Sequence, residues 1–182
     1  MKKYILSIDQ GTTSSRIVLY NLKFQVLDII QKEFKQYFPK NGWVEHNPEE
    51  IWKTTKKVLL KTINRSKKLK GRILTIGITN QRETTIMWDR VTGKPVYNAI
   101  VWQDRRTADF CNKFKSKKMQ RIINRKTGLL IDPYFSGTKI KWIIDNVLEA
   151  KKLLKKKQLL FGTVDTFLLW RLSKGAVHAT DA

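Results

Sequence analysis

The chain has few of the residues that build disulfides and metal sites. It contains one cysteine, Cys111, and two histidines, His46 and His178. A single cysteine excludes an internal disulfide and any zinc site made of several cysteines. The histidines are far apart in the sequence and lack metal-ligand spacing, so no histidine-based metal site is expected. Cys111 lies in a helical stretch with Phe110 and Phe114, which favours a small core residue over a nucleophile.

Acidic residues are scarce as well. The chain has 15 acidic and 37 basic residues, giving a formal net charge of +22. Such an excess usually indicates nucleic acid or an anionic membrane as a partner. Only ten of the basic residues are arginine, however, and lysine is less suited to bidentate recognition of bases and phosphates. The lysines cluster on expected helices or at their ends, at positions 56–57, 67–70, 115–118 and 151–157.

We therefore interpret the charge as solvated helix faces and expect no specific nucleic-acid partner. A polyanion-binding patch is one alternative, because a high positive field attracts nucleic acid whatever the fold. The other alternative is that compensating acidic residues belong to a part of the protein outside this chain.

Long apolar runs are also missing. No run approaches the length of a membrane span, and the segment before Asp9 lacks the apolar region of a signal peptide. We therefore expect a cytoplasmic protein without a membrane span. A hydrophobic content of 41%, with six tryptophans and eight phenylalanines, excludes a disordered chain, and 182 residues suffice for a domain with its own core.

Periodicity and turn residues predict a sheet followed by a helix. Three strands at 4–8, 16–20 and 25–34 follow one another closely, which favours a meander. A helix should then begin behind Asn47 as its N-cap, with a proline in its first position, and stop at Gly71.

The second half of the chain mixes strands with helices. The apolar run at 73–79 predicts a buried strand. Residues 85–88 and 99–103 are expected to form a hairpin around a glycine- and proline-containing turn. Helices should follow near residues 105–114 and 118–127, after Ser136 as a cap, and at 164–172, with a short strand at 159–163.

The octet Asp9–Arg16 is the first motif that carries chemistry. It lies between two apolar strands and contains one acid, one glycine and four consecutive hydroxyl residues. Such a turn can present backbone N–H groups and hydroxyls to a phosphate, with Asp9 beside them to hold a metal-bound water. An ordinary polar hairpin turn is the alternative, because glycine, serine and threonine are common turn residues.

Asn80–Thr85 is the second motif, and it also follows an apolar strand. Arg82 offers several donors in a planar fork, and Glu83 offers only acceptors. Together they suit a polyol, whose hydroxyls each need a donor and an acceptor. A surface ion pair worth less than about 1 kcal/mol is the alternative.

These motifs resemble glycerol kinase, a family within the sugar and polyol kinases. The first motif alone would indicate only the larger group, whereas Asn80–Thr85 together with Asp132–Lys139 indicates glycerol kinase. The resemblance runs in order through nearly the whole chain and is carried further by 42–46, 76–79, 97–103, Gly128 and 161–166.

The resemblance implies an α/β fold of the ribonuclease H-like (actin-like ATPase) type, with a mixed sheet, flanking helices and an inserted helical part. Members of the family have two lobes and are much longer. We therefore expect residues 1–182 to be the N-terminal kinase domain, incomplete at its C-terminus, with the second lobe and the catalytic base beyond Ala182. The exposed lobe interface should make the chain poorly soluble.

The resemblance also implies roles for particular residues. Nucleotide phosphates should meet Gly11, Thr12, Thr13, Ser14 and Arg16, and Asp9 should organise Mg²⁺ through water. Glycerol should meet Arg82, Glu83, Trp102 and Tyr134, although for Trp102 a plain core position is the alternative.

Four other acids, Asp104, Asp132, Asp145 and Asp165, are not assigned as the base, because a base must reach the substrate hydroxyl. Asp132 and Asp165 are expected to be capping or turn acids. Asp104 follows Gln103, where its charge could alter the rim of the pocket.

The expected activity is ATP-dependent phosphorylation of glycerol to sn-glycerol 3-phosphate in glycerol catabolism. Its cofactors would be ATP and Mg²⁺, and its partners glycerol and ATP, with the full-length form a homo-oligomer. The chain alone is expected to be inactive because it lacks the base. A related sugar or polyol kinase and a non-catalytic basic binding remnant are the alternatives.

Overall fold

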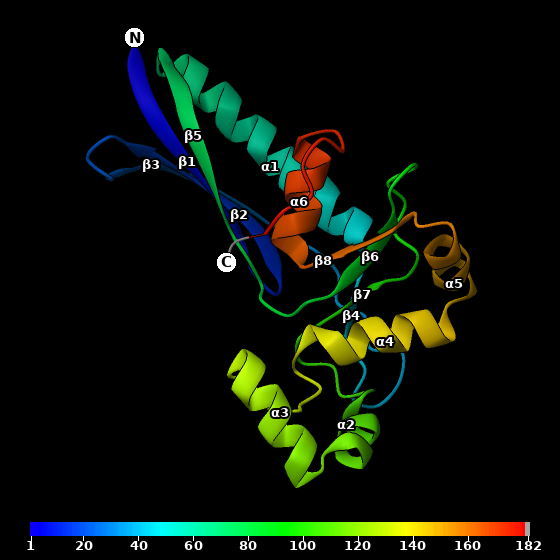
Figure 1. The fold of residues 1–182 in the computed structure, drawn as a ribbon. Coiled ribbons are helices and arrows are strands. Elements are labelled where there is room, and N and C mark those ends of the chain that lie inside the picture. The colour runs from blue at the N-terminus through cyan, green and yellow to red at the C-terminus, as the bar shows by residue number, and fades with distance from the viewer. Residues whose placement is uncertain (181–182) are drawn as a thin grey trace. The chain divides into compact units, whose positions relative to one another are not determined.

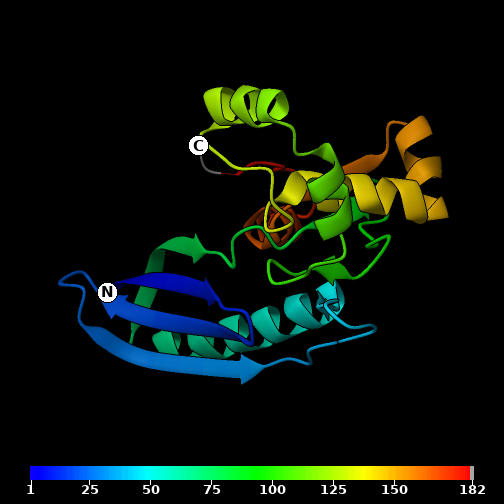
Figure 2. The ribbon, with the colours of Figure 1, turned by 90° about the horizontal axis from the view of Figure 1, so that it is seen from below.

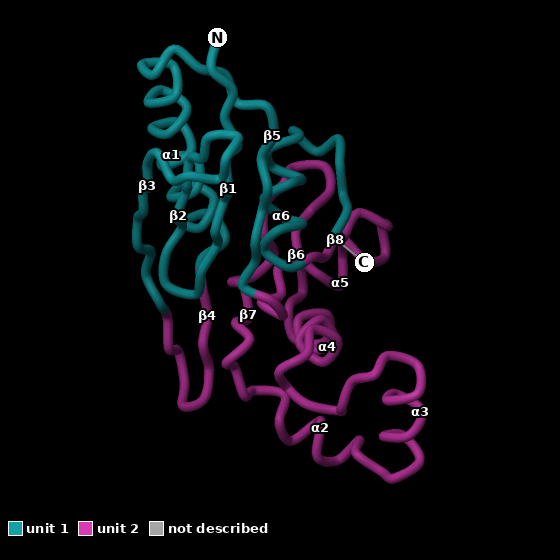
Figure 3. The backbone as a smooth tube through the Cα atoms, turned by 90° about the vertical axis from the view of Figure 1, so that its left-hand side faces the viewer, with its two compact units in different colours: residues 1–36, 47–81, 163–182 teal, residues 37–46, 82–162 magenta. Residues whose placement is uncertain are grey.

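The chain forms two compact units in the computed structural model, which describes residues 1–180. Unit 1 comprises Met1–Gln36, Asn47–Gln81 and Thr163–Ala182. Unit 2 comprises Tyr37–His46 and Arg82–Gly162 (Figure 3). The backbone crosses between the units repeatedly, which is why the sequence contains no single linker. The helical part expected after the first sheet corresponds to the longer segment of unit 2.

Unit 1 is built on a mixed four-stranded sheet. Its strands are β1 (Lys2–Gln10), β2 (Ser14–Asn21), β3 (Val26–Glu33) and β5 (Gly71–Thr79), in the order β3-β2-β1-β5 (Figure 1). The first three strands pair antiparallel, as the predicted meander requires, and β5 pairs parallel to β1. A parallel neighbour needs a crossover connection, and a helix supplies it.

That helix, α1 (Pro48–Lys68), lies along one face of the sheet (Figure 2). Its start is as predicted: proline occupies the first turn, and the Asn47 side chain accepts a hydrogen bond from the Glu49 amide at 2.9 Å. Alternate residues of β1 are buried on the core side, and α1 contributes Ile51, Val58 and Leu59 to the same core. Burying each such side chain stabilises the fold by about 1.5–3 kcal/mol.

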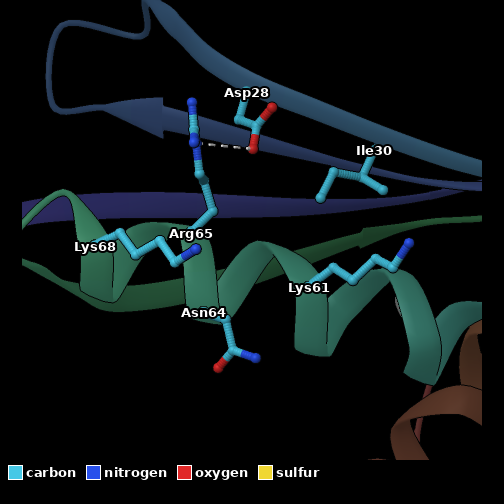
Figure 4. Close-up of a pocket in the computed structure, with 6 residues that line it drawn as sticks. All are labelled: Asp28, Ile30, Lys61, Asn64, Arg65 and Lys68. Carbon is cyan, nitrogen blue, oxygen red and sulfur yellow. Dashed lines mark ion pairs between the residues drawn. The ribbon is translucent and has the colours of Figure 1, made fainter.

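The far end of α1 is charged and open to solvent. Arg65 forms an ion pair with Asp28 of β3, with 3.8 Å between Nε and Oδ2 (Figure 4). Lys61, Asn64 and Lys68 line the same shallow hollow beside Ile30. The lysines of this segment therefore belong to an exposed helix end, in keeping with the interpretation of the charge.

The end of α1 corrects one expectation. Gly71 is not the stop of the helix but the first residue of β5, and the residue in the left-handed region is Lys70, with φ +55°. A glycine is needed at 71 for another reason. A Cβ atom there would lie only 1.9 Å from Cε2 of the buried Tyr4 ring, whose hydroxyl donates to the Leu69 carbonyl at 3.2 Å.

The strand β5 corrects a second expectation, because it is not buried. Within the described residues it is an edge strand of the sheet, and Leu74 and Ile76 are 46% and 42% exposed. An apolar run alone does not tell a central strand from an edge strand whose side chains remain accessible. Unit 1 also contains α6 (Val164–Leu172), which lies where it was predicted.

Unit 2 has two short antiparallel pairs and four helices. The strand β4 (Glu45–His46) pairs with β7 (Ala99–Ile100), and β6 (Ile86–Asp89) pairs with β8 (Leu159–Gly162). The predicted hairpin of 85–88 with 99–103 is therefore wrong. These two segments are joined by the isolated bridge Thr85–Ile100 and not by a continuous ladder. The helices are α2 (Ala108–Phe114), α3 (Lys117–Thr127), α4 (Ser136–Asn146) and α5 (Leu148–Lys155).

The core of unit 2 gathers around Met87, Ile100, Ile143 and Ala150, all buried. Cys111 is also buried, as expected of a core residue. The helix α3 ends as predicted at Gly128, whose φ is +72° and whose amide donates to the Asn124 carbonyl at 2.7 Å. The cap of α4 was predicted wrongly: Phe135 is the N-cap, and Ser136 is the first helical residue.

The glycine at 71 provides a test of the packing in unit 1. Gly71→Ala should lower the free energy of unfolding by about 1–3 kcal/mol, because the added methyl group collides with the Tyr4 ring. Gly77→Ala in the same strand is the matched control, since no atom lies within 4 Å of a Cβ there. Urea unfolding followed by circular dichroism measures both changes. Equal stabilities of the two variants would contradict the close packing of Gly71 on Tyr4.

Candidate active site

The hydroxyl-rich turn joins β1 to β2 in unit 1. The Gly11 amide donates to the Ser14 carbonyl at 3.0 Å and closes the turn. The carbonyls of Thr12 and Thr13 accept from Gln36 Nε2 at 3.1 Å and from the Phe34 amide at 3.2 Å. The turn is thus tied to the chain that follows β3, and Thr13 lies exposed.

Gln10 supports this turn from inside the core, a role that the sequence analysis missed. Its side chain is 1% exposed, and Nε2 donates to the carbonyls of Gly11 and Ser14 at 3.3 and 3.4 Å. Its Oε1 accepts from the hydroxyls of Ser15 and Thr55 at 2.9 and 3.0 Å. The signal in the sequence was a polar residue at a core-facing position of an alternating strand. A buried network with all its members paired rigidifies the backbone around it.

Asp9 and Arg16 face each other across the β1–β2 ladder as register partners. Arg16 donates through Nε to Asp9 Oδ2 at 2.9 Å, and its second hydrogen bond to Asp9, from NH2, ends on the same oxygen. Both side chains are partly exposed and line a hollow on the sheet with Ser7 and Thr79. The structure thus brings together the predicted metal residue and one predicted phosphate residue.

The donor set at this turn fits a hydrated Mg²⁺ and not a dedicated metal cage. Within residues 1–180, no three His, Cys, Asp or Glu side chains are grouped so that they could hold a metal ion. Magnesium keeps several waters and binds proteins through one or two carboxylates together with substrate phosphates. Asp9 supplies one such carboxylate, in a hollow that it shares with the hydroxyl residues Ser7 and Thr79.

Glu83 is the central residue of the second motif, and it belongs to unit 2. Its φ is +64°, in the left-handed region that a non-glycine residue rarely adopts. Its Oε2 accepts hydrogen bonds from the amide and the hydroxyl of Ser136, at 2.8 and 2.7 Å. A carboxylate at the first turn of α4 is favourably placed, because helix N-termini attract negative charge.

The surface ion pair considered for Arg82 and Glu83 is not present. Glu83 is engaged by α4, and exposed Arg82 has no ion-pair partner among the residues that the structure describes. Arg82 is therefore exposed, whereas the carboxylate of the next residue, Glu83, is fixed by Ser136.

Tyr134 and Trp102 lie in the same neighbourhood of unit 2. Their ring centroids are 6.1 Å apart with an interplanar angle of 68°, an edge-to-face contact. The Tyr134 carbonyl and the Glu83 carbonyl both accept from the ammonium of Lys139, at 2.5 and 2.8 Å. Trp102 is half-buried, which disfavours the plain core position. Glu83, Trp102 and Tyr134, three of the four predicted glycerol residues, are thus brought together, and Arg82 directly precedes Glu83 in the chain.

A buried charge cluster lies in the same unit, and the sequence analysis missed it. Arg106 donates to Asp104 Oδ1 and Oδ2 and to Glu45 Oε1, at 2.9, 2.8 and 2.8 Å, and its side chain is fully buried. Its guanidinium carbon lies 3.8 Å from the centroid of the Trp43 ring and 4.6 Å from that of Trp142. Burial lowers the pKa of Arg106, but the bonds to both carboxylates outweigh it and hold the pKa above its usual value.

This cluster corrects the expectation for Asp104. The residue is 1% exposed and does not lie on the rim of a pocket. Besides Arg106, it accepts from the Val44 amide at 2.7 Å. Glu45 also accepts from Tyr97 and Asn98, at 2.7 and 2.9 Å. These hydrogen bonds and ion pairs connect the segment at 43–46 to the segment at 97–106.

Residues 4–182 match the N-terminal domain of the FGGY family of carbohydrate kinases. The chain belongs to this family. FGGY kinases have the actin-like ATPase fold, and the mixed sheet with flanking helices described above is the N-terminal portion of that fold.

The chain is also similar to individual members of the family. The chain is 55% identical to the glycerol kinase of Geobacillus sp. (strain WCH70) over 181 residues, which cover 100% of this chain and 36% of that protein. The crystal structure of Plasmodium falciparum glycerol kinase with ADP superposes with a TM-score of 0.90 at 38% identity, over 96% of this chain and 35% of the other. The gluconate kinase of Lactobacillus acidophilus shares the fold at 23% identity and a TM-score of 0.78, over 94% and 33%.

The FGGY chain described here therefore spans about a third of the length of the relatives that it matches. None of its helices within residues 1–180 is both long enough and apolar enough to cross a bilayer.

The buried cluster generates a stability prediction for this family member. Arg106→Met should lower the free energy of unfolding by about 3–5 kcal/mol, because it leaves the carboxylates of Glu45 and Asp104 buried without their cation. Arg105→Met is the matched control, since its pair with Asp132 spans 3.8 Å and its side chain is 60% exposed, and it should change stability by less than about 0.5 kcal/mol. Thermal and urea unfolding of both variants measure the difference. Similar losses in the two variants would contradict the importance of the buried cluster.

Proposed function

We propose that this chain carries the glycerol site and part of the ATP site of a glycerol kinase, which transfers the terminal phosphoryl group of ATP to a primary hydroxyl of glycerol and yields sn-glycerol 3-phosphate. The observation that carries the proposal is the fixed carboxylate of Glu83, held by α4 in a cluster with Tyr134 and Trp102. The names of the two glycerol kinase relatives support the choice of substrate.

On the glycerol side, the roles follow from donors and acceptors. Both bonds from Ser136 end on Glu83 Oε2, so Oε1 is the oxygen that would accept from a substrate hydroxyl. Arg82 would supply donors, since a guanidinium has five of them and no acceptor. Tyr134 would add a phenolic hydrogen bond, and the Trp102 ring would cover the carbon chain and exclude water beside it.

On the nucleotide side, the turn at 11–14 and Arg16 would contact the phosphates of ATP. Asp9 would hold a water of the Mg²⁺ ion, which when bound neutralises phosphate charge during phosphoryl transfer. Both bonds from Arg16 end on Asp9 Oδ2, which leaves Oδ1 for that water. Phosphoryl transfer depends on positioning and on charge neutralisation, so a rigid turn supported by Gln10 is suited to it.

We assign the catalytic base to no residue of this chain. Asp104 is bound to Arg106, Asp132 accepts from the Tyr134 amide at 2.8 Å, and Asp145 pairs with Lys141 at 2.7 Å. Asp165 accepts from the hydroxyls of Thr163 and Thr180. Asp132 is thus a turn acid, as expected, whereas Asp165 lies in the first turn of α6 behind the N-cap Thr163 and is neither a capping nor a turn residue. The engaged carboxylates support leaving all four acids unassigned as the base.

The proposal predicts a selective defect for Glu83→Gln. In the complete product of the gene that encodes this chain, the change should lower kcat/KM for glycerol by about 100-fold, because an amide cannot provide the charged acceptor. The KM for ATP should stay within about twofold. A coupled assay of ADP formation measures both constants.

Glu149→Gln is the matched control, since Glu149 is exposed on α5 and pairs only loosely with Lys152 at 3.9 Å. Glycerol, xylulose and gluconate should be compared as substrates. Preference for xylulose or gluconate would support a related sugar kinase, and a wild-type product that phosphorylates none of the three would overturn the proposal.

A second prediction concerns the phosphate turn. The φ of Gly11 is not in the left-handed region, and a Cβ there would lie 3.4 Å from the Ser14 carbonyl, an ordinary contact. Gly11→Ala should therefore change the free energy of unfolding by less than about 0.5 kcal/mol. The same change should raise the KM for ATP by about tenfold, because the methyl group obstructs the approach of the phosphates to the backbone. Wild-type KM for ATP in a stable Gly11→Ala variant would exclude a phosphate contact at this residue.

A further inference from the structure

Lys139 is the most deeply buried lysine of the described chain. Its relative exposure is 0%, although lysine is seldom buried completely unless it is paired. It lies in the second turn of α4, three residues after Ser136 and thus on the same face of the helix. A charge in this position is tolerated only if its donors are used.

Two of its three donors bond backbone carbonyls. Nζ donates to the Glu83 carbonyl at 2.8 Å and to the Tyr134 carbonyl at 2.5 Å, and it lies 5.9 Å from the centroid of the Tyr134 ring. The two residues are 51 positions apart in the chain, so one side chain connects two separate segments. Hydrogen bonds from a charged donor are about twice as strong as neutral ones.

Glu83 is held by α4 at both of its ends. Ser136 binds its carboxylate, and Lys139 binds its carbonyl, while its backbone keeps the unfavourable φ of +64°. A left-handed non-glycine residue persists only where its surroundings determine its conformation. Without the ammonium, the Glu83 carbonyl would lose its short hydrogen bond and retain the longer one from the Thr85 hydroxyl, at 3.4 Å.

We propose that Lys139 is a positioning residue that fixes Glu83 and Tyr134 relative to each other and thereby sets the affinity for glycerol. This inference rests on the proposed glycerol site. Lys139 touches neither substrate in this assignment; it acts through the backbone of the two residues that do.

The charge state of Lys139 links this role to pH. Burial lowers its pKa from 10.5 to about 8, against the opposing influence of the carboxylates of Glu83, Asp104 and Asp132. The charged form, which binds the carbonyls most strongly, is therefore lost above about pH 8.

Loss of the Lys139 charge should weaken glycerol binding, but it should stabilise the fold. A buried ammonium with a depressed pKa destabilises the fold below about pH 8, and this destabilisation is relieved between about pH 8 and pH 10.5. Weaker glycerol binding above pH 8 would thus not result from unfolding caused by Lys139.

The test uses the complete gene product and compares KM values across pH. In the wild type, the KM for glycerol should be constant below about pH 8 and rise about tenfold by about pH 9.5, while the KM for ATP stays within about twofold. Lys139→Met should raise the KM for glycerol about tenfold at pH 7 and remove this alkaline rise. Lys141→Met on the same helix, whose exposed ammonium pairs with Asp145, is the matched control and should behave as the wild type.

The outcomes separate the two proposals. A wild-type product that phosphorylates no glycerol overturns the proposed function and this inference with it. Phosphorylation with a KM for glycerol that is flat across the whole pH range overturns the positioning role alone, and this measurement needs no variant to fold. A well-folded Lys139→Met variant with the wild-type KM for glycerol also overturns the positioning role alone.

Discussion

The candidate glycerol site depends on one constraint: hydrogen bonds from the first two turns of α4 hold Glu83 in place. The left-handed conformation of Glu83 is unfavourable by about 1–3 kcal/mol, so it requires fixed partners. Ser136 provides two hydrogen bonds to the carboxylate, and Lys139 provides one to the carbonyl. The position of the site is therefore determined by a helix that lies more than fifty residues further along the chain.

Two buried cations, Arg106 and Lys139, connect separate segments of unit 2. Arg106 connects Glu45 with Asp104, and Lys139 connects the carbonyls of Glu83 and Tyr134. Buried ion pairs add little net stability compared with apolar groups of similar volume, yet removing one partner is strongly destabilising. Such contacts favour one arrangement of segments over others, which is what a site with precise spacing needs. In unit 1, a buried network of neutral side chains around Gln10 likewise holds separate segments in one arrangement.

The local parts of the fold could be predicted, and the non-local parts could not. Alternating apolar residues and short polar turns predicted the meander of β1, β2 and β3, and Asn47 with Pro48 predicted the start of α1. The pairing of β6 with β8 could not be read from periodicity, because it joins strands about seventy residues apart. Likewise, Gly71 resembled a helix stop, whereas its real constraint is the ring of Tyr4.

The sequence by itself determined the FGGY family, the candidate residues and their chemical types, because motifs such as Asp9–Arg16 and Asn80–Thr85 are contiguous and can be recognised without coordinates. Only the tertiary structure decided which polar residues are buried and whom they bind. The roles of Gln10, Arg106 and Lys139 depend on contacts between distant segments, and a buried lysine looks like any other lysine in a chain with a charge of +22. Burial and hydrogen-bond partners are properties of the folded chain, so they become visible only when the segments are packed.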